Sequence, residues 1–296
     1  MLALLRKDSR LIFFILSGII LITLLSHLSY STFLEPVIRY GHFFIIGIFA
    51  ATVANSTGAG GGIVFIPAFI ALGLSPLESL ATSFAIQCFG MTAGALSWLS
   101  YRRIEINKHA KQWHSFFKIM LLSCAGSITG IQFTQQLMPS PPIDVELLFS
   151  VFSLIVGLVI LHRTLKINHE SPGRISVLET QESILIFVAC LVGGALTAWL
   201  SIAVGEILAI VLIFLGFRVN LAIAAAVCVT SVSVLSAIPF HVYTSEAVNL
   251  NVLVFAAPGA LIGGALARRL AIYLGAHRLK IFMACWIIIS AFTYFV

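Results

Sequence analysis

The stretch Asn55-Ser-Thr-Gly-Ala-Gly-Gly-Gly-Ile-Val-Phe-Ile-Pro67 interrupts a long apolar region with small and polar residues. Four of the five positions from Gly58 to Gly62 are glycine, which permits unusual backbone angles and the close approach of another group. In hydrocarbon, such an irregular backbone is tolerated only where it is buried in protein or lines a water-filled cavity. The stretch therefore predicts a break between two helices of a membrane protein, and we interpret it as half of a substrate site.

The composition places the whole chain in a membrane. Of its 296 residues, 60% are hydrophobic and 9% are charged, whereas soluble domains carry about 25% charged residues. The net charge of +6 is more typical of cytoplasmic loops under the positive-inside rule than of a nucleic-acid partner. The five cysteines lie far apart within apolar runs, which favours small buried hydrophobes over disulfides or metal ligands.

Apolar segments follow one another along the chain, and a membrane-spanning helix needs about 20 such residues. The first, 11–28, follows a basic start and lacks a small-residue cleavage site, so we predict a retained span. Ten more segments follow: 42–57, 61–73, 78–100, 115–137, 146–162, 183–200, 204–217, 221–241, 249–267 and 279–296. An N-terminus in the cytoplasm brings every basic cluster inside, which supports a multi-pass membrane protein with this number of segments.

The two halves of the chain repeat each other. Gly62 to Gly73 matches Gly205 to Gly216, an offset of 143 positions, and Gly126 to Gly130 matches Gly259 to Gly263, an offset of 133. Each copy has five segments, an odd number, so consecutive copies enter from opposite faces, as in many secondary transporters. We predict an all-α fold of two inverted repeats, with broken or re-entrant helices meeting at the midplane. The expected parts are an N-terminal span and loop (1–36), a first repeat (37–165), a cytoplasmic linker (166–182) and a second repeat (183–296).

Candidate anion ligands cluster at both breaks. A helix that opens near Gly61 presents unpaired N–H groups and the positive end of its dipole, which favours oxyanions. Helix packing through small residues is the alternative for the glycines, and back-bonding to the preceding turn is the alternative for the hydroxyl groups. The predicted substrate-binding residues are Asn55, Ser56, Thr57, Gly60, Gly61, Gly62, Thr82, Ser83, Gln87, Trp199 and Ser201.

Glu206 is the one acidic residue inside an apolar segment. An ionised carboxylate is costly in lipid, so such residues usually face a cavity and serve ion or proton pathways. We therefore predict that Glu206 couples transport to protons. A neutral, hydrogen-bonded glutamate that caps the second break is one alternative, and an interfacial residue is the other.

Three motifs, Gly58-Ala-Gly-Gly-Gly-Ile-Val-Phe-Ile-Pro67, Leu72-Gly-Leu-Ser-Pro76 and Ala81-Thr-Ser83, resemble the first signature of the TauE/SafE sulfite exporter family, also called toluene-sulfonate uptake permeases. The regions around Gly205-Glu206, Gly216 and Pro258–Gly263 are similar to its second half, although Ile210 stands where the family has a proline. The resemblance covers about residues 40–296. It implies a prokaryotic plasma-membrane transporter of sulfur-containing anions such as sulfite, sulfonates or sulfoacetate.

The sequence thus predicts a proton-coupled secondary transporter of small anions, and the resemblance implies that these anions contain sulfur. A passive anion channel would share the two breaks, a membrane enzyme or assembly factor would need a catalytic constellation that is not found, and a cation transporter would need more intramembrane carboxylates. We expect no enzymatic activity, no catalytic or metal-binding residues and no cofactor. The expected partners are a small anion, protons and the lipid bilayer, without nucleic acid. The substrate, the direction of transport and homo-oligomerisation stay open.

Overall fold

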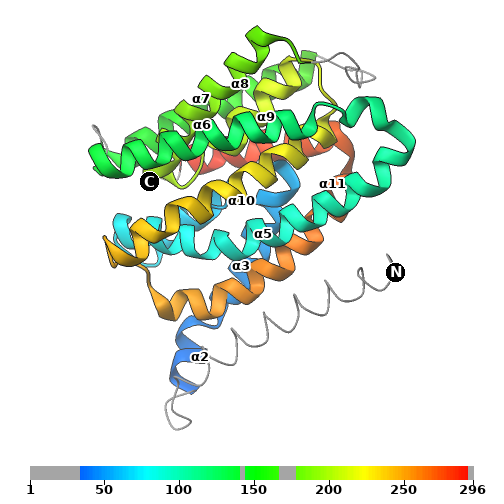
Figure 1. The fold of residues 1–296 in the computed structure, drawn as a ribbon. Coiled ribbons are helices and arrows are strands. Elements are labelled where there is room, and N and C mark those ends of the chain that lie inside the picture. Colours follow the sequence, from blue (N-terminus) through cyan, green and yellow to red (C-terminus); the bar gives the residue numbers. More distant parts are fainter. Residues whose placement is uncertain (1–33, 141–143, 167–177, 293–296) are drawn as a thin grey trace, which may run out of the picture.

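The computed structural model describes residues 34–140, 144–166 and 178–292, and every element in them is a helix (Figure 1). The predicted span at 11–28 lies outside these residues. The other ten predicted segments each coincide with a helix or part of one, which confirms the all-helical fold. The elements are α2 (Leu34–Tyr40), α3 (His42–Thr57), α4 (Gly62–Ala71), α5 (Pro76–His109), η2 (Ala110–Trp113), α6 (Phe116–Leu137), α7 (Val145–Lys166), α8 (Thr180–Leu200), α9 (Val204–Phe214), α10 (Val219–Tyr243) and α11 (Leu250–Phe292).

Six spans among the described residues are long and apolar enough to cross a membrane, α2 and α3 counting together as one. By contrast, α4 and α9 have only 10 and 11 residues, roughly 15 and 17 Å at 1.5 Å per residue. That is about half of a hydrocarbon core of ~30 Å. Each short helix therefore returns from inside the bundle toward one of its ends.

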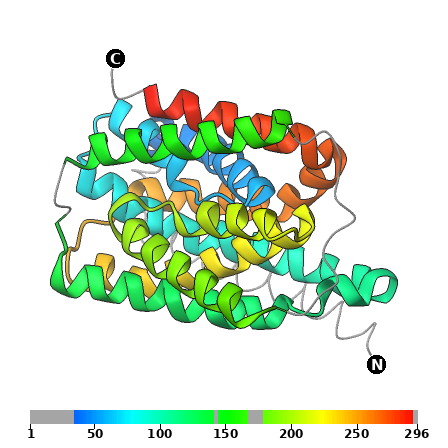
Figure 2. The same ribbon diagram turned by 90° about the horizontal axis from the view of Figure 1, so that it is seen from above.

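The connections between helices gather at the two ends of the bundle (Figures 1 and 2). One end carries the α5–α6 and α9–α10 connections and the break of α11 at Gly275, where the backbone has φ 72° and ψ 162°. Arg103, Lys111, Arg218 and Arg269 lie in or beside these connections, so we call this the basic end. The opposite end carries the α4–α5, α6–α7 and α10–α11 connections.

Two helical hairpins place their turns in the interior. In the first, α3 and α4 are joined by Gly58–Gly61, which we call tip one. In the second, α8 and α9 are joined by Ser201–Ala203, which we call tip two. All seven tip residues are buried. The hairpins predicted from the two short apolar segments are therefore present, and both turns lie inside the protein.

Glycines let the long helices pack with their backbones in contact. A Cβ atom built at Gly263 of α11 would lie 2.2 Å from the carbonyl oxygen of Ile48 in α3, and one at Gly130 of α6 would lie 2.1 Å from that of Leu191 in α8. The two glycines are 133 positions apart (263 minus 130) and their partners 143 (191 minus 48), the offsets found in the sequence. The matched contacts support the predicted internal repeat, whose inverted orientation stays a prediction.

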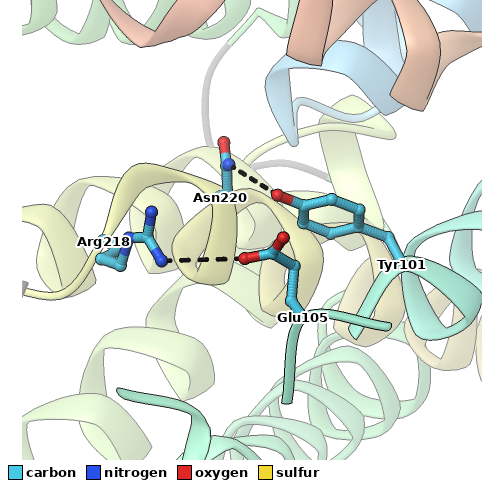
Figure 3. A network of polar contacts seen from close by, with 4 residues as sticks. All are labelled: Tyr101, Glu105, Arg218 and Asn220. Atoms are coloured by element: carbon cyan, nitrogen blue, oxygen red, sulfur yellow. Dashed lines mark hydrogen bonds and ion pairs between the residues drawn. The ribbon is translucent and has the colours of Figure 1, made fainter. Parts of the chain in front are cut away.

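The long helix α5 makes polar contacts at both ends of the bundle. At the basic end, Arg218 approaches Glu105 of α5, with Nη1 3.9 Å from Oε2, and Asn220 donates a hydrogen bond of 3.3 Å to the hydroxyl of Tyr101 (Figure 3). At the opposite end, the side chain of Asn249 donates to Glu78 at 2.6 Å. The start of α5 is fixed by Ser75, whose hydroxyl accepts from the Glu78 amide, and by Pro76 in the first turn.

The Gly263→Val substitution tests the contact between α11 and α3. Its new Cβ would overlap the Ile48 carbonyl, and because backbone atoms cannot rotate away, we expect a loss of about 3 kcal/mol or more. Thermal unfolding in detergent should show a much lower melting temperature. Ala265→Val is the control, since the Ala265 side chain is exposed on the same helix. Equal melting temperatures for the two variants would contradict the packing.

Candidate functional site

The two tips touch each other, and glycines make the contact close. Gly58 ends α3 with φ 87°, and Ser201 ends α8 with φ 56°, so both turns use the left-handed region. A Cβ atom at Gly205 would lie 2.2 Å from the Gly58 carbonyl oxygen, and one at Gly62 would lie 2.8 Å from the Ser201 carbonyl oxygen. Part of the glycine pattern therefore serves close packing, the alternative considered from the sequence.

The carboxylate of Glu206 joins the two tips. Its Oε1 accepts a hydrogen bond of 3.0 Å from the Gly60 amide, and its Oε2 accepts one of 2.9 Å from the Ala203 amide. Gly60 lies just before α4, and Ala203 is the N-cap residue of α9, so the carboxylate faces the N-terminal ends of two helices. Only 1% of Glu206 is exposed. Helix N-termini stabilise negative charge, most strongly where water is excluded.

Gln87 of α5 forms a second bridge between the tips. Its Oε1 accepts a hydrogen bond of 2.8 Å from the Gly61 amide. Its Nε2 donates to the hydroxyl and the carbonyl oxygen of Ser201, at 2.7 and 3.2 Å. The hydroxyl groups of Ser83 and Ser201 lie 3.1 Å apart. Of the predicted ligands, the structure thus brings together Gly60, Gly61, Gly62, Ser83, Gln87 and Ser201, and it places them beside Glu206, the predicted proton-coupling residue.

Three other predicted ligands, Asn55, Ser56 and Thr57, lie buried in the last turn of α3 just before tip one. Their side chains donate to carbonyl groups of their own helix: Asn55 Nδ2 to Ala51 at 2.8 Å, and the Ser56 and Thr57 hydroxyls to Val53 at 3.0 and 2.9 Å. This is the back-bonding pattern expected of such residues in helices. Their donors are engaged within α3 in this state of the protein.

Thr82 and Trp199 lie outside the network that joins the tips. The Thr82 hydroxyl accepts a hydrogen bond of 2.9 Å from the amide of Asn249, ahead of α11. The indole N–H of Trp199 donates to the Met138 carbonyl oxygen at the end of α6, at 2.9 Å. The sequence spacing placed both near the site, but their side chains turn toward neighbouring helices.

Thr230 of α10 is a site residue that the sequence analysis did not select. Its hydroxyl oxygen would lie 2.6 Å from a Cβ atom built at Gly205, so it adjoins the start of α9. The residue is 2% exposed, and this oxygen is buried without a hydrogen-bond partner among the described residues. The repeat offset could have identified it, because 87 plus 143 is 230 and Thr230 therefore corresponds to Gln87.

The described residues hold no group of three or more His, Cys, Asp or Glu side chains arranged to bind a metal ion. The groups at the tips are hydrogen-bond donors, two helix N-termini and one buried acid. Such groups can bind an oxyanion and exchange a proton.

Helices that break in pairs inside an all-helical bundle, with polar groups at the breaks, define a polytopic membrane protein with the plan of a secondary transporter. The chain matches the model of the family described as sulfite exporter TauE/SafE over residues 43–294. It belongs to this family, which is a family of membrane transporters and not of enzymes. Comparisons with curated proteins and with solved structures returned no match.

Ala203 is strained, and its relief gives a test of tip two. Its φ of 121° is a conformation that residues with a side chain rarely adopt. Such strain costs about 1–3 kcal/mol, whereas the extra unfolded-state entropy of glycine costs about 0.5–1 kcal/mol. We expect Ala203→Gly to raise the melting temperature in detergent by the equivalent of ~1 kcal/mol.

The matched control is Ala209→Gly in the middle of α9, where the backbone is helical and glycine should destabilise by about 1 kcal/mol. The same substitution thus has opposite signs at two positions six residues apart in one hairpin. A lower melting temperature for both variants would show that Ala203 carries no strain.

Proposed function

We propose that this chain carries small, sulfur-containing anions such as sulfite or sulfonates across the plasma membrane, and that it couples their movement to protons through Glu206. Family membership supports the transport of an anion of this kind. The observation that supports the coupling is the position of Glu206, a buried acid held between the ends of two helices at the contact of both tips.

The electrostatics of the tips favour an anion over a cation as the cargo. Positive potential comes from the N-terminal ends of α4 and α9, which converge on one point. In the described part of the chain, the hydrogen-bond partners of Glu206 are backbone amides, so no cationic side chain occupies this place. An oxyanion suits such a place because it accepts several N–H groups at once.

A passive anion channel is the second candidate, because it would use the same donors. A channel needs a continuous path, whereas the residues of both tips are buried and the two tips are in contact. This closed arrangement favours a transporter, which exposes its site to one face at a time.

The Glu206→Gln substitution distinguishes the two candidates. We expect wild-type protein in liposomes to drive the accumulation of sulfite or sulfoacetate when a pH gradient is imposed. Gln keeps the size of the side chain but cannot release a proton, so this accumulation should fall to the level of protein-free liposomes. Exchange of labelled anion without a gradient should persist, because anion binding is kept.

Glu182→Gln is the matched control. Glu182 also accepts the N-cap amide of its helix at 2.9 Å, from Glu179 at the start of α8, but it lies near the surface. Its variant should transport like the wild type. If the Glu206 variant keeps its gradient-driven accumulation, Glu206 does not couple protons. If the anion flux through the wild-type protein does not depend on the pH gradient, the result would favour the channel.

We further propose that the basic end faces the cytoplasm, together with the N-terminus. Lys111 is exposed in η2, within the α5–α6 connection at the basic end, and Glu246 is exposed in the α10–α11 connection at the opposite end. In a Cys285→Ala background, which removes an exposed native thiol, a membrane-impermeant maleimide should label Glu246→Cys in intact cells. Lys111→Cys should react only after the cells are opened, and the reverse pattern would invert the orientation.

A further inference from the structure

Glu206 occupies the place that a substrate anion would take. Backbone amides at the ends of two helices are the donors expected to bind an oxyanion, and here the Gly60 and Ala203 amides already bind the carboxylate of Glu206. The protein thus carries its own anion at the contact of the tips. A substrate that uses the same amides has to compete with it.

We propose that the substrate anion binds by displacing the Glu206 carboxylate from the Gly60 and Ala203 amides, and that the displaced carboxylate takes up one proton from the solvent. This inference rests on the proposed function, and it adds how the coupling occurs. A carboxylate without donors is strongly unfavourable in a dry interior, so its displacement and its protonation go together. One anion and one proton then cross the membrane in the same direction.

Thr230 points to the class of anion. Its hydroxyl is buried beside Gly205 without a hydrogen-bond partner among the described residues, so an unused polar group adjoins the start of α9, the helix whose N-cap amide binds Glu206. A carboxylate has two oxygens, and the two of Glu206 match the two amides. A sulfonate or sulfite group has three, and Thr230 supplies the third donor. The site should therefore prefer a three-oxygen head group over a carboxylate.

Other titratable groups do not account for a proton taken up at this place. The titratable side chains in the core around α9 or packed against it are the thiols of Cys88, Cys124, Cys190 and Cys228 and the phenol of Tyr101, all of which are uncharged at neutral pH. The charged residues and histidines on the helices that form or contact the tips lie toward the helix ends: His42 on α3, Glu78, Arg102, Arg103, Glu105, Lys108 and His109 on α5, Glu182 on α8, and Arg218 and His241 at the two ends of α10.

Calorimetry can count the proton directly. Methanesulfonate, which does not titrate between pH 5 and 8, is added to the purified full-length protein in buffers of different ionisation enthalpy. We expect the wild type to take up about one proton per anion, with an affinity that falls about tenfold per pH unit where Glu206 is ionised. Glu206→Gln should take up none, should bind more tightly at neutral pH, and should lose the pH dependence. Glu182→Gln should behave like the wild type.

Thr230→Val tests the third donor without removing a contact that the fold uses, since the hydroxyl is unpaired. We expect the preference for methanesulfonate over acetate to fall about tenfold, the loss of roughly one hydrogen bond to a charged group. Ser231→Ala, which removes the neighbouring hydroxyl that contacts Thr92, should leave this preference unchanged. An unchanged preference in the Thr230 variant would overturn the role of Thr230.

The outcomes separate this inference from the function on which it rests. If the wild type binds methanesulfonate with no proton uptake, or if Glu206→Gln binds it with the same affinity and pH dependence, displacement is wrong although the protein still binds anions. If neither methanesulfonate nor sulfite binds to the wild type or to the Gln variant, and sulfite is not transported, the proposed function itself fails.

Discussion

The interaction on which the interior depends is the pairing of one carboxylate with the N-terminal ends of two helices. Neither short helix could start at this depth without partners for its first amides, because the residues of both tips are buried away from the surface. Glu206 supplies one partner to each helix, and Gln87 supplies another to tip one. The same hydrogen bonds also hold the two hairpins together. The carboxylate of Glu206 therefore both satisfies the amides at the helix ends and stabilises the contact between the hairpins.

The glycines follow from this pairing. For a single carboxylate to reach both helix ends, the tips must approach until their backbones are in contact, and Gly62 and Gly205 lie where a side chain would prevent it. The long helices pack equally closely at Gly130 and Gly263, where a side chain would overlap the backbone of the neighbouring helix. In lipid, where apolar side chains gain little by leaving their surroundings, close backbone packing of this kind is a main source of cohesion between helices.

Much of the architecture could be predicted from the sequence, because length and hydropathy define membrane helices and the short segments 61–73 and 204–217 stood out. Glu206, Gln87, Ser83 and Ser201 were selected as site candidates for a related reason, since polar groups in apolar runs are conspicuous. The hydrogen-bond partners of these residues could not be predicted. Nothing in the spacing shows that Glu206 binds the amide of Gly60, 146 positions away, or that Thr82 turns to Asn249. Those choices depend on how helices from both halves pack together.

Thr230 shows the opposite case, in which the information was in the sequence but needed the structure to give it meaning. By the repeat offset, Thr230 corresponds to Gln87, but the two side chains are chemically unlike. A threonine in an Ala- and Val-rich helix does not stand out as a candidate ligand. Only its position beside Gly205, with a buried oxygen left over, distinguishes it from an ordinary helical threonine.

The length of α5 has a mechanical consequence. With 34 residues it extends roughly 50 Å, and it contacts Asn249 near its start, the tips through Ser83 and Gln87, and Arg218 near its far end. A rigid rod held at an inner point behaves as a lever: a tilt that parts one end presses the other together. If α5 tilted about its contacts with the tips, the site would move little while the two ends swung in opposite senses. Such a tilt would admit solvent from one side without opening a through-path, and a single helix would enforce this exclusion.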